Sequence, residues 1–301
     1  KFATICGITE EELYTTFAED IRCLAEKDRT GVEETKQKLK EWYDGYHFTP
    51  ECPDLYNPFS LLNVFFEMRF RSYWYETGTP SFLVELLKKD HYDLYRMAHE
   101  EVTEDMLMGL DAMEESPIPV LYQSGYLTLK SYDPVFGLYT LGFPNREVDE
   151  GFTRYLLPRY ATMRTGESAF QIRNFIQEVM RGDTDAFMRR LQSFFADTPY
   201  ELARDLEVHY QNVLFIVFKL LGFYVQVEYH TSQGRIDLVL QTPQYIYVME
   251  FKLDGTAEEA LQQIEEKQYA LPFASDARKL YKVGVNFSNA VRNIEKWIVK
   301  E

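Results

Sequence analysis

The stretch GRIDLVL at residues 234–240, followed by YVMEFK at residues 247–252, decides how this 301-residue chain is interpreted. Both segments are apolar enough to form buried strands, yet they carry Asp237, Glu250 and Lys252. Charged side chains are costly to bury without partners. We therefore expect a hairpin that brings the three charges together, either as a functional site or as a structural ion-pair cluster, and we favour the site.

The geometry of a strand predicts which charges share a face. Side chains alternate between the two faces, so Glu250 and Lys252 lie on the same one. Asp237 joins them only if the hairpin pairs odd with even residue numbers, which a two- or four-residue turn near residues 242–244 provides. Two carboxylates so placed suit Mg²⁺ or Mn²⁺, which would polarise a phosphate and activate a water molecule. Lys252 would orient that water or stabilise the developing negative charge.

The elements around this hairpin predict an α/β or α+β module of residues 201–301. A helix over 202–221 ends at Gly222, and a capping box of Thr256 and Glu259 begins a second helix that reaches about residue 269. The expected strands cover residues 223–229, 234–241, 245–252 and 280–286, and a final helix is expected over 290–300.

Residues 1–115 are expected to be mainly helical. Thr9 is typical of a helix N-cap, and helices are expected over 32–43, 57–66, 81–87 and 92–98.

Residues 116–200 are expected to form a connecting segment. A helix at 120–124, strands at 126–131 and 137–141 and a helix at 146–160 outline a winged-helix-like unit, and 166–200 is expected to be helical up to a boundary at 197–199. The ribbon is poor in Arg and Lys, which favours a spacer or interaction role over DNA binding.

The hairpin resembles the site of the PD-(D/E)xK nuclease superfamily, in which one strand carries an acid and the next carries (Asp/Glu)-x-Lys. The resemblance is strongest to the C-terminal domain of bacterial proteins with an N-terminal AAA-ATPase-like domain. It rests on residues 234–237 (GRID), 250–252 (EFK), 260–264 (ALQQI) with Tyr269, and 283–288 (VGVNFS). Residues 41–46 (EWYDGY) with 56–58 (YNP) resemble the tail of the ATPase-like region, and 123–128 (QSGYLT) with 142–148 (GFPNREV) resemble its connecting segment.

The resemblance implies a restriction-endonuclease-like fold with an αβββαβ core and two further site residues. Glu207, on the first helix, is a candidate supporting acid, although a first-turn Glu is also favoured by the helix dipole. Gln263 occupies the position of a motif glutamine, although the polar outer side of an ordinary amphipathic helix explains it equally well. Lys267, one turn later, is in reach of a phosphate, but for this residue we favour the ordinary polar side of the helix. Tyr269 is expected to pack, and His209 to have a surface or capping role. Some relatives keep this fold but have lost the catalytic chemistry, so membership of the superfamily does not by itself imply that this chain is active.

Composition narrows the classes of protein that this chain can represent. The net charge of −16 argues against indiscriminate nucleic-acid binding, but residues 201–301 carry only −3 and residues 1–200 carry −13.

The longest apolar run, 213–218, is far short of the ~20 residues that span a bilayer. Three cysteines without paired metal spacing suggest free thiols in a reducing, cytoplasmic compartment. No secretory leader is visible, and the start at Lys1 suggests a fragment of a longer protein.

Other catalytic motifs are not found in the sequence. It lacks a Gly-x-x-x-x-Gly-Lys-(Ser/Thr) loop, so no ATP site is expected within this chain, and it lacks Gly-x-Ser-x-Gly and His-Glu-x-x-His patterns. His91 and His99 are expected at the surface. Trp42, Tyr43 and Tyr46 would suit base stacking, but we favour an aromatic core cluster.

The sequence therefore predicts a Mg²⁺-dependent nuclease at the C-terminus of a truncated ATPase-like protein, with DNA as the expected substrate. Asp237 and Glu250 would bind the metal, Lys252 would assist the water, and Glu207 and Gln263 would support them. The alternative is an inactive nuclease-fold module that binds protein partners, among them the missing ATPase-like region. No membrane partner is expected.

Overall fold

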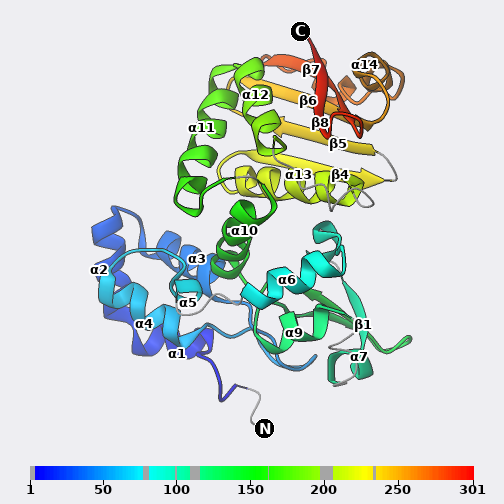
Figure 1. Ribbon diagram of the computed structural model, residues 1–301. Coiled ribbons are helices and arrows are strands. Elements are labelled where there is room, and N and C mark those ends of the chain that lie inside the picture. Colours follow the sequence, from blue (N-terminus) through cyan, green and yellow to red (C-terminus); the bar gives the residue numbers. More distant parts are fainter. Residues whose placement is uncertain are drawn as a thin grey trace. The chain divides into compact units, whose positions relative to one another are not determined.

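The structure is a computed structural model that describes residues 4–76, 81–98, 100–108, 116–161, 163–196, 206–232 and 235–301 (Figure 1). The chain divides into two compact units, Lys1–Phe152 and Thr153–Glu301, called here the N-terminal and C-terminal units. The sequence-based division at residues 115 and 200 stays a prediction.

Helices form the first part of the N-terminal unit, as expected. Their bounds are α1 Glu10–Thr16, α2 Ala18–Asp28, α3 Val32–Tyr43, α4 Pro58–Glu67, α5 Tyr73–Glu76, α6 Ser81–Lys89 and a 3₁₀ turn Leu94–Ala98. Thr9 caps α1 in a capping box with Glu12, and Asn57 caps α4 with Pro58 at its first position. The core of these helices contains Leu13, Leu24, Leu39, Tyr43 and Leu61, all fully buried.

A small antiparallel sheet forms the second part of the N-terminal unit. It contains β1 Glu101–Thr103, β2 Thr128–Asp133 and β3 Leu138–Gly142 in the order β1-β3-β2. The helices in this part of the chain are α7 Glu104–Met108, α9 Ile118–Gln123 and the first half of α10 Arg146–Tyr160. The helices and the ribbon expected over 120–160 are present, whereas β1 is a strand inside the region expected to be mainly helical. The winged-helix comparison stays a prediction.

The C-terminal unit is a five-stranded sheet with helices on both faces. The helices are α11 Ser168–Arg181, α12 Thr184–Phe194, α13 Leu206–Gly222 and α14 Ala257–Glu266, with short 3₁₀ turns at Thr165–Glu167 and Leu271–Phe273. The strands are β4 Gln226–Ser232, β5 Arg235–Gln241, β6 Tyr245–Leu253, β7 Lys279–Ser288 and β8 Asn293–Lys300, in that order across the sheet. All neighbours are antiparallel except β6 and β7, which α14 connects. Figure 1 shows this sheet in yellow to red.

The prediction of a final helix over 290–300 is wrong, because residues 293–300 form β8. Ile294, Trp297 and Ile298 are spaced three and four residues apart, which suggests a helix, but all three side chains also favour strands. The outer edge of β7 offers hydrogen-bond partners to this segment, and Val285 pairs with Trp297 there. Long-range pairing therefore overrode an ambiguous local pattern.

The two faces of β6 contact different helices. On one face, Tyr247 donates a 2.6 Å hydrogen bond to the carbonyl oxygen of Val179 in α11, and Phe251 packs against Phe218 of α13 with ring centroids 6.1 Å apart. On the other face, Ile246 and Val248 pack with Leu261 and Ile264 of α14, and Val239 of β5 joins them. Strand alternation puts Asp237, Glu250 and Lys252 on this second face, next to α14.

Candidate functional site

The hairpin of β5 and β6 has the register that the sequence predicted. Asp237 is paired with Glu250, and Arg235 with Lys252, so odd numbers pair with even ones. The side chains of directly opposed residues lie on the same face, with Cβ atoms about 4.5–5.5 Å apart. The two carboxylates are thus neighbours on the α14 face of the sheet.

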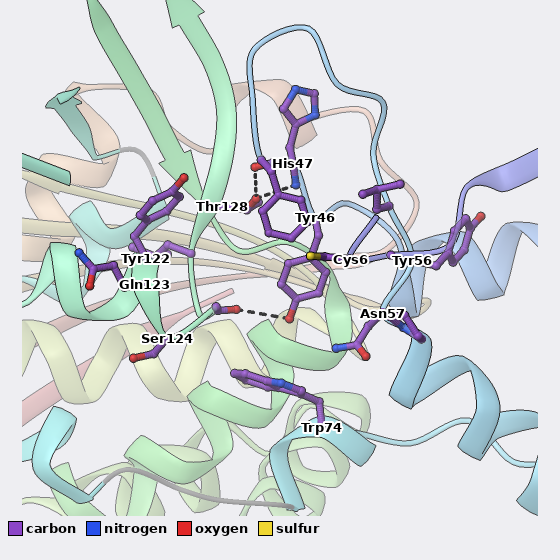
Figure 2. Close-up of a pocket in the computed structure, with 16 residues that line it drawn as sticks. Cys6, Tyr46, His47, Tyr56, Asn57, Trp74, Tyr122, Gln123, Ser124 and Thr128 are labelled. Atoms are coloured by element: carbon purple, nitrogen blue, oxygen red, sulfur yellow. Dashed lines mark hydrogen bonds between the residues drawn. The ribbon is translucent and has the colours of Figure 1, made fainter. Parts of the chain in front are cut away.

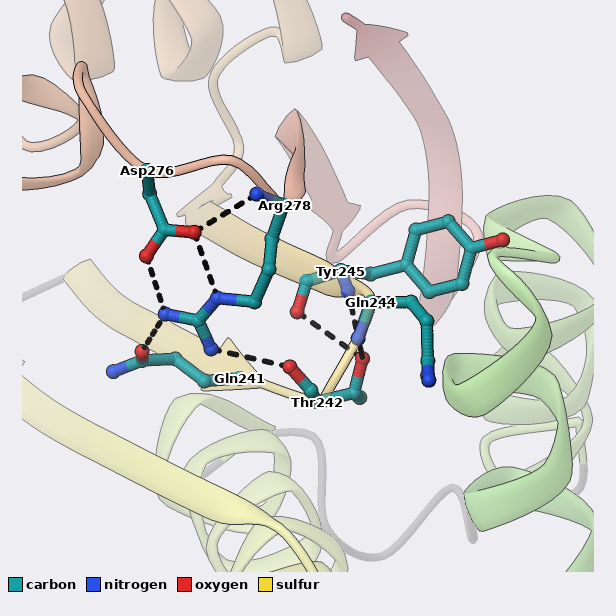
Figure 3. A network of polar contacts seen from close by, with 6 residues as sticks. All are labelled: Gln241, Thr242, Gln244, Tyr245, Asp276 and Arg278. Carbon is teal, nitrogen blue, oxygen red and sulfur yellow. Dashed lines mark hydrogen bonds and ion pairs between the residues drawn. The ribbon is translucent and has the colours of Figure 1, made fainter.

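The tight turn at residues 242–245 fixes this register. Thr242 donates its backbone N–H to the Tyr245 carbonyl at 2.8 Å, and its hydroxyl accepts from the Tyr245 N–H at 2.9 Å. Arg278 donates to the Thr242 carbonyl at 3.1 Å and to Gln241 at 2.9 Å (Figure 3). Arg278 is held in turn by Asp276, and its hydrogen bonds lower the pKa of that carboxyl to about 2. Since a slip of one residue would move Asp237 to the opposite face, these contacts protect the site.

Glu250, Lys252 and Gln263 are brought together. Glu250 is fully buried, and its Oε1 lies 3.5 Å from the ammonium nitrogen of Lys252. The same ammonium group donates a hydrogen bond to the side-chain oxygen of Gln263 on α14. Lys252 is thereby held between a strand carboxylate and a helix amide.

Asp237 differs from Glu250 in exposure. It is half-buried, so one carboxylate of the pair is accessible and the other is enclosed. This donor set fits Mg²⁺, which takes one or two protein carboxylates and completes its shell with water and substrate phosphate. Among the residues that the structure describes, no group of three or more His, Cys, Asp and Glu side chains could hold a metal ion. Any divalent cation here would rely on this carboxylate pair.

Three neighbours of the site were not identified from the sequence. His230 of β4 is paired with Asp237 and is exposed, Gly284 of β7 is paired with Glu250, and Asn286 with Lys252. The strand expected over residues 223–229 stops one residue short of His230, whereas β4 continues to Ser232. The parallel register of β6 and β7 joins segments about 30 residues apart, and no local signal predicts it.

Asn286 links the loop after β6 to the last two strands. It is buried, its side-chain oxygen accepts from the Gly255 N–H at 3.1 Å, and its amide nitrogen donates to Glu295 at 2.9 Å. These contacts hold the loop that begins α14. They consequently help to place Gln263 beside Lys252.

The structure also places the other residues that the sequence analysis named. Glu207, in the first turn of α13, accepts a 3.3 Å hydrogen bond from Gln211 on its own helix, and its role as a supporting acid stays a prediction. Lys267 is exposed just after α14. Tyr269 packs in the α14 core as expected, and His209 is half-buried, with its ring centroid 6.4 Å from that of Phe195. Gly234, from the GRID motif, lies outside the described residues.

Comparisons with known proteins agree with this geometry. Residues 205–297 match the model of the PD-(D/E)XK nuclease superfamily, whose nucleases generally use divalent metals such as Mg²⁺. A protein of Azotobacter chroococcum mcd 1, described as "Uncharacterized protein in vnfD 5'region", is 29% identical over 314 residues. The match covers all of this chain and 57% of that relative, so the chain spans little more than half its length. No solved structure matches significantly.

A helix that crosses a bilayer needs about 20 consecutive, mainly apolar residues. In the described ranges, no helix is both long and apolar enough to cross a bilayer.

Proposed function

We propose that the C-terminal unit hydrolyses phosphodiester bonds of nucleic acid, with DNA as the substrate and Mg²⁺ or Mn²⁺ as the cofactor. The observation that carries this proposal is the direct pairing of Asp237 with Glu250 beside Lys252. A like-charge pair directly opposed in a sheet is destabilising, so it is best explained by a role as cation ligands. The superfamily match over residues 205–297 supports the same reading.

In this proposal each residue has a defined task. Asp237 and Glu250 would hold the cation, which when bound supplies charge for the phosphate and acidifies a water molecule. Lys252 would orient a water molecule beside the phosphate and would stabilise the negative charge that develops as the phosphodiester bond breaks. Gln263 fixes the Lys252 ammonium group through its side-chain oxygen. Glu207 would act as a supporting acid.

A second candidate is an inactive nuclease-fold module that binds protein partners. It is favoured by the acidity of the first two thirds of the chain, because residues 1–200 carry a net charge of −13. The net charge of −16 also suits protein contacts better than contacts with nucleic acid.

A nuclease assay separates the two candidates. The purified chain is incubated with double-stranded DNA, single-stranded DNA or RNA in Mg²⁺, Mn²⁺ or EDTA, alongside Asp237→Ala, the isosteric Asp237→Asn and Lys252→Ala. Glu258→Ala and Lys296→Ala, which remove an exposed ion pair in the same unit, are the matched controls. We expect metal-dependent cleavage that the controls keep and the three site variants lose. Circular dichroism should show that the two Asp237 variants remain folded, and urea unfolding gives the stability that Lys252→Ala retains, so that loss of activity is separated from unfolding. Equal cleavage by the site variants would refute the assignment, and the absence of millimolar Mg²⁺ or Mn²⁺ binding by calorimetry would favour the binding module.

We also propose that residues 1–115 are the tail of an AAA-ATPase-like domain and that residues 116–200 connect it to the nuclease-like domain. This rests on the resemblance of the segments at 41–46, 56–58, 123–128 and 142–148.

A further inference from the structure

A cavity of about 420 Å³ opens in the N-terminal unit, and the proposed function does not use it (Figure 2). All of its lining residues fall within residues 6–128. Its size lies in the range of pockets that bind small organic ligands, about 300–1,000 Å³. It is therefore large enough for a ring system with substituents.

The cavity forms where several conspicuous sequence segments meet. Its lining residues come from 6–7, 46–48, 55–58, 74 and 122–128, which include parts of the EWYDGY, YNP and QSGYLT segments. Two isolated antiparallel bridges, Ile8 with Tyr56 and Tyr46 with Leu55, join the first three of these. Separate parts of the chain are thus held around one space by backbone hydrogen bonds.

The walls are aromatic and neutral. Tyr46, Trp74 and Tyr122 are half-buried and face the cavity, and Tyr56 is fully buried behind them. Apolar side chains, uncharged polar side chains and His47 complete the lining, and in the described part of this unit no Asp, Glu, Lys or Arg belongs to it. A ligand that is charged where it enters would lose its hydration without gaining an ion partner, so the occupant is uncharged there.

The space between Tyr46 and Trp74 is maintained by a glycine. Gly125 has φ +78°, and a Cβ atom on it would lie 3.6 Å from the Trp74 ring and 3.8 Å from the Tyr46 ring. The Tyr46 hydroxyl donates to the Gly125 carbonyl at 3.3 Å, which fixes the ring. Any larger residue at 125 would be strained and would narrow the gap between the rings.

Polar atoms lie next to these flat surfaces. The side-chain oxygen of Asn57 accepts from two N–H groups of α4, at 3.0 and 3.3 Å, and its amide nitrogen points toward the Tyr46 hydroxyl (Figure 2). Thr128 exchanges hydrogen bonds of 2.8 and 2.9 Å with the His47 backbone, which holds the opposite wall. Aromatic rings with hydrogen-bonding groups beside them suit a flat ligand that carries its polar atoms along its edge.

We propose that this cavity binds a nucleobase, as a nucleoside or as an unpaired base of a strand. A nucleobase is planar, uncharged and polar only at its edge, and bases of every kind stack on aromatic side chains. The sugar and any phosphate remain outside the cavity.

Two cysteines provide a matched pair of reporters for the test. Cys6 lines the cavity and Cys23 lies on α2, and both are exposed, whereas Cys52 is buried. The full chain carrying Asp237→Ala is titrated in EDTA with adenosine, guanosine, cytidine, thymidine and short single-stranded DNA, so that the result does not depend on nuclease activity. Binding is followed by calorimetry, and thiol alkylation at each cysteine is followed by mass spectrometry.

We expect at least one nucleoside or strand to bind and to slow alkylation of Cys6 severalfold while leaving Cys23 unaffected. Cys6→Trp, which fills the entrance, should weaken binding at least tenfold, and Cys23→Trp should not. Tighter binding of strands than of nucleosides identifies an unpaired base as the occupant, and the reverse identifies a free nucleoside. The proposal is overturned if neither binds at millimolar concentration, if binding leaves the Cys6 rate and the Cys6→Trp variant unchanged, or if phenol binds while nucleosides do not.

Discussion

Gly284 of β7 is the register partner of Glu250 of β6, and α14 lies so close to Gly284 that a Cβ atom there would be 2.2 Å from the carbonyl oxygen of Ala257. The same atom would be 2.7 Å from the Leu261 nitrogen. Both contacts are with helix backbone, which cannot rotate away as a side chain can. The approach of α14 to the strand that carries Glu250 and Lys252 therefore depends on glycine at this position.

Gly284→Ala should destabilise the C-terminal unit. The methyl group forces α14 away from the sheet, and overpacking of this kind costs roughly 1–3 kcal/mol. Urea unfolding followed by circular dichroism measures the loss. Gly166→Ala is the control, since a Cβ atom on Gly166 meets nothing within 4 Å. An equal response of the two variants would show that the close approach is not present in solution.

Lys252→Ala should be strongly destabilising because it leaves the fully buried Glu250 without its neighbouring ammonium group. Breaking a buried ion pair costs roughly 3 kcal/mol or more, and adding Glu250→Gln should recover at least about 1 kcal/mol of it. A double-mutant cycle on unfolding free energies measures this coupling. Lys296→Ala, which breaks an exposed pair with Glu258, should cost less than about 1 kcal/mol. Additive effects at positions 250 and 252 would contradict the pairing.

Mg²⁺ should raise the thermal stability of the C-terminal unit, because a ligand that binds only the folded state stabilises it. At ten times the dissociation constant, the gain is about 1.4 kcal/mol. Asp237→Asn should abolish this gain, and without metal it should be slightly more stable than the parent protein, by roughly 0.2–1 kcal/mol, since it removes a like-charge pair. Differential scanning calorimetry with and without Mg²⁺ tests both effects. A variant that still responds to Mg²⁺ would exclude Asp237 as a ligand.

The N-terminal unit should lose stability as the pH rises through neutrality. Burial raises the pKa of the Glu147 carboxyl from 4.5 to about 7, although the Ser60 hydroxyl donates to it at 2.6 Å and the Trp74 N–H at 2.8 Å. A carboxyl with a raised folded-state pKa favours folding fully only below its unfolded value, and the benefit declines as the pH rises through about 7.

Glu147→Gln mimics the protonated acid and should remove this decline. At pH 9 the variant should be more stable than the parent by at most about 3 kcal/mol, from about 1.4 kcal/mol per pKa unit, whereas at pH 4 the two should be similar. Chemical unfolding across this range gives the comparison, with the exposed Glu34→Gln as control. Burial also raises the pKa of Asp44 to about 6. Because Asp44 is present in both the variant and the parent, its contribution cancels in the difference between their unfolding free energies. Parallel stability curves would contradict a buried, titrating Glu147.

Much of the C-terminal unit follows from local patterns. Alternation predicts the hairpin, and the Thr256–Glu259 capping box begins α14 where the sequence placed it. The final helix was wrong because Ile294, Trp297 and Ile298 fit either a helix or a strand, and only the unpaired edge of β7 distinguishes the two. The cavity of the N-terminal unit could not be predicted either, since its walls come from segments about 120 residues apart.

The sequence by itself determined which charged residues form the candidate site and on which face of the sheet they lie. Strand periodicity and a tight turn are local properties, and together they put Asp237 opposite Glu250 and Lys252 beside them. The tertiary structure decided what surrounds these residues: the parallel pairing of β7, the contact of Lys252 with Gln263, and the close approach of α14 at Gly284. Each of these depends on burying apolar surface and satisfying backbone groups between distant segments, and no local sequence pattern specifies such pairings.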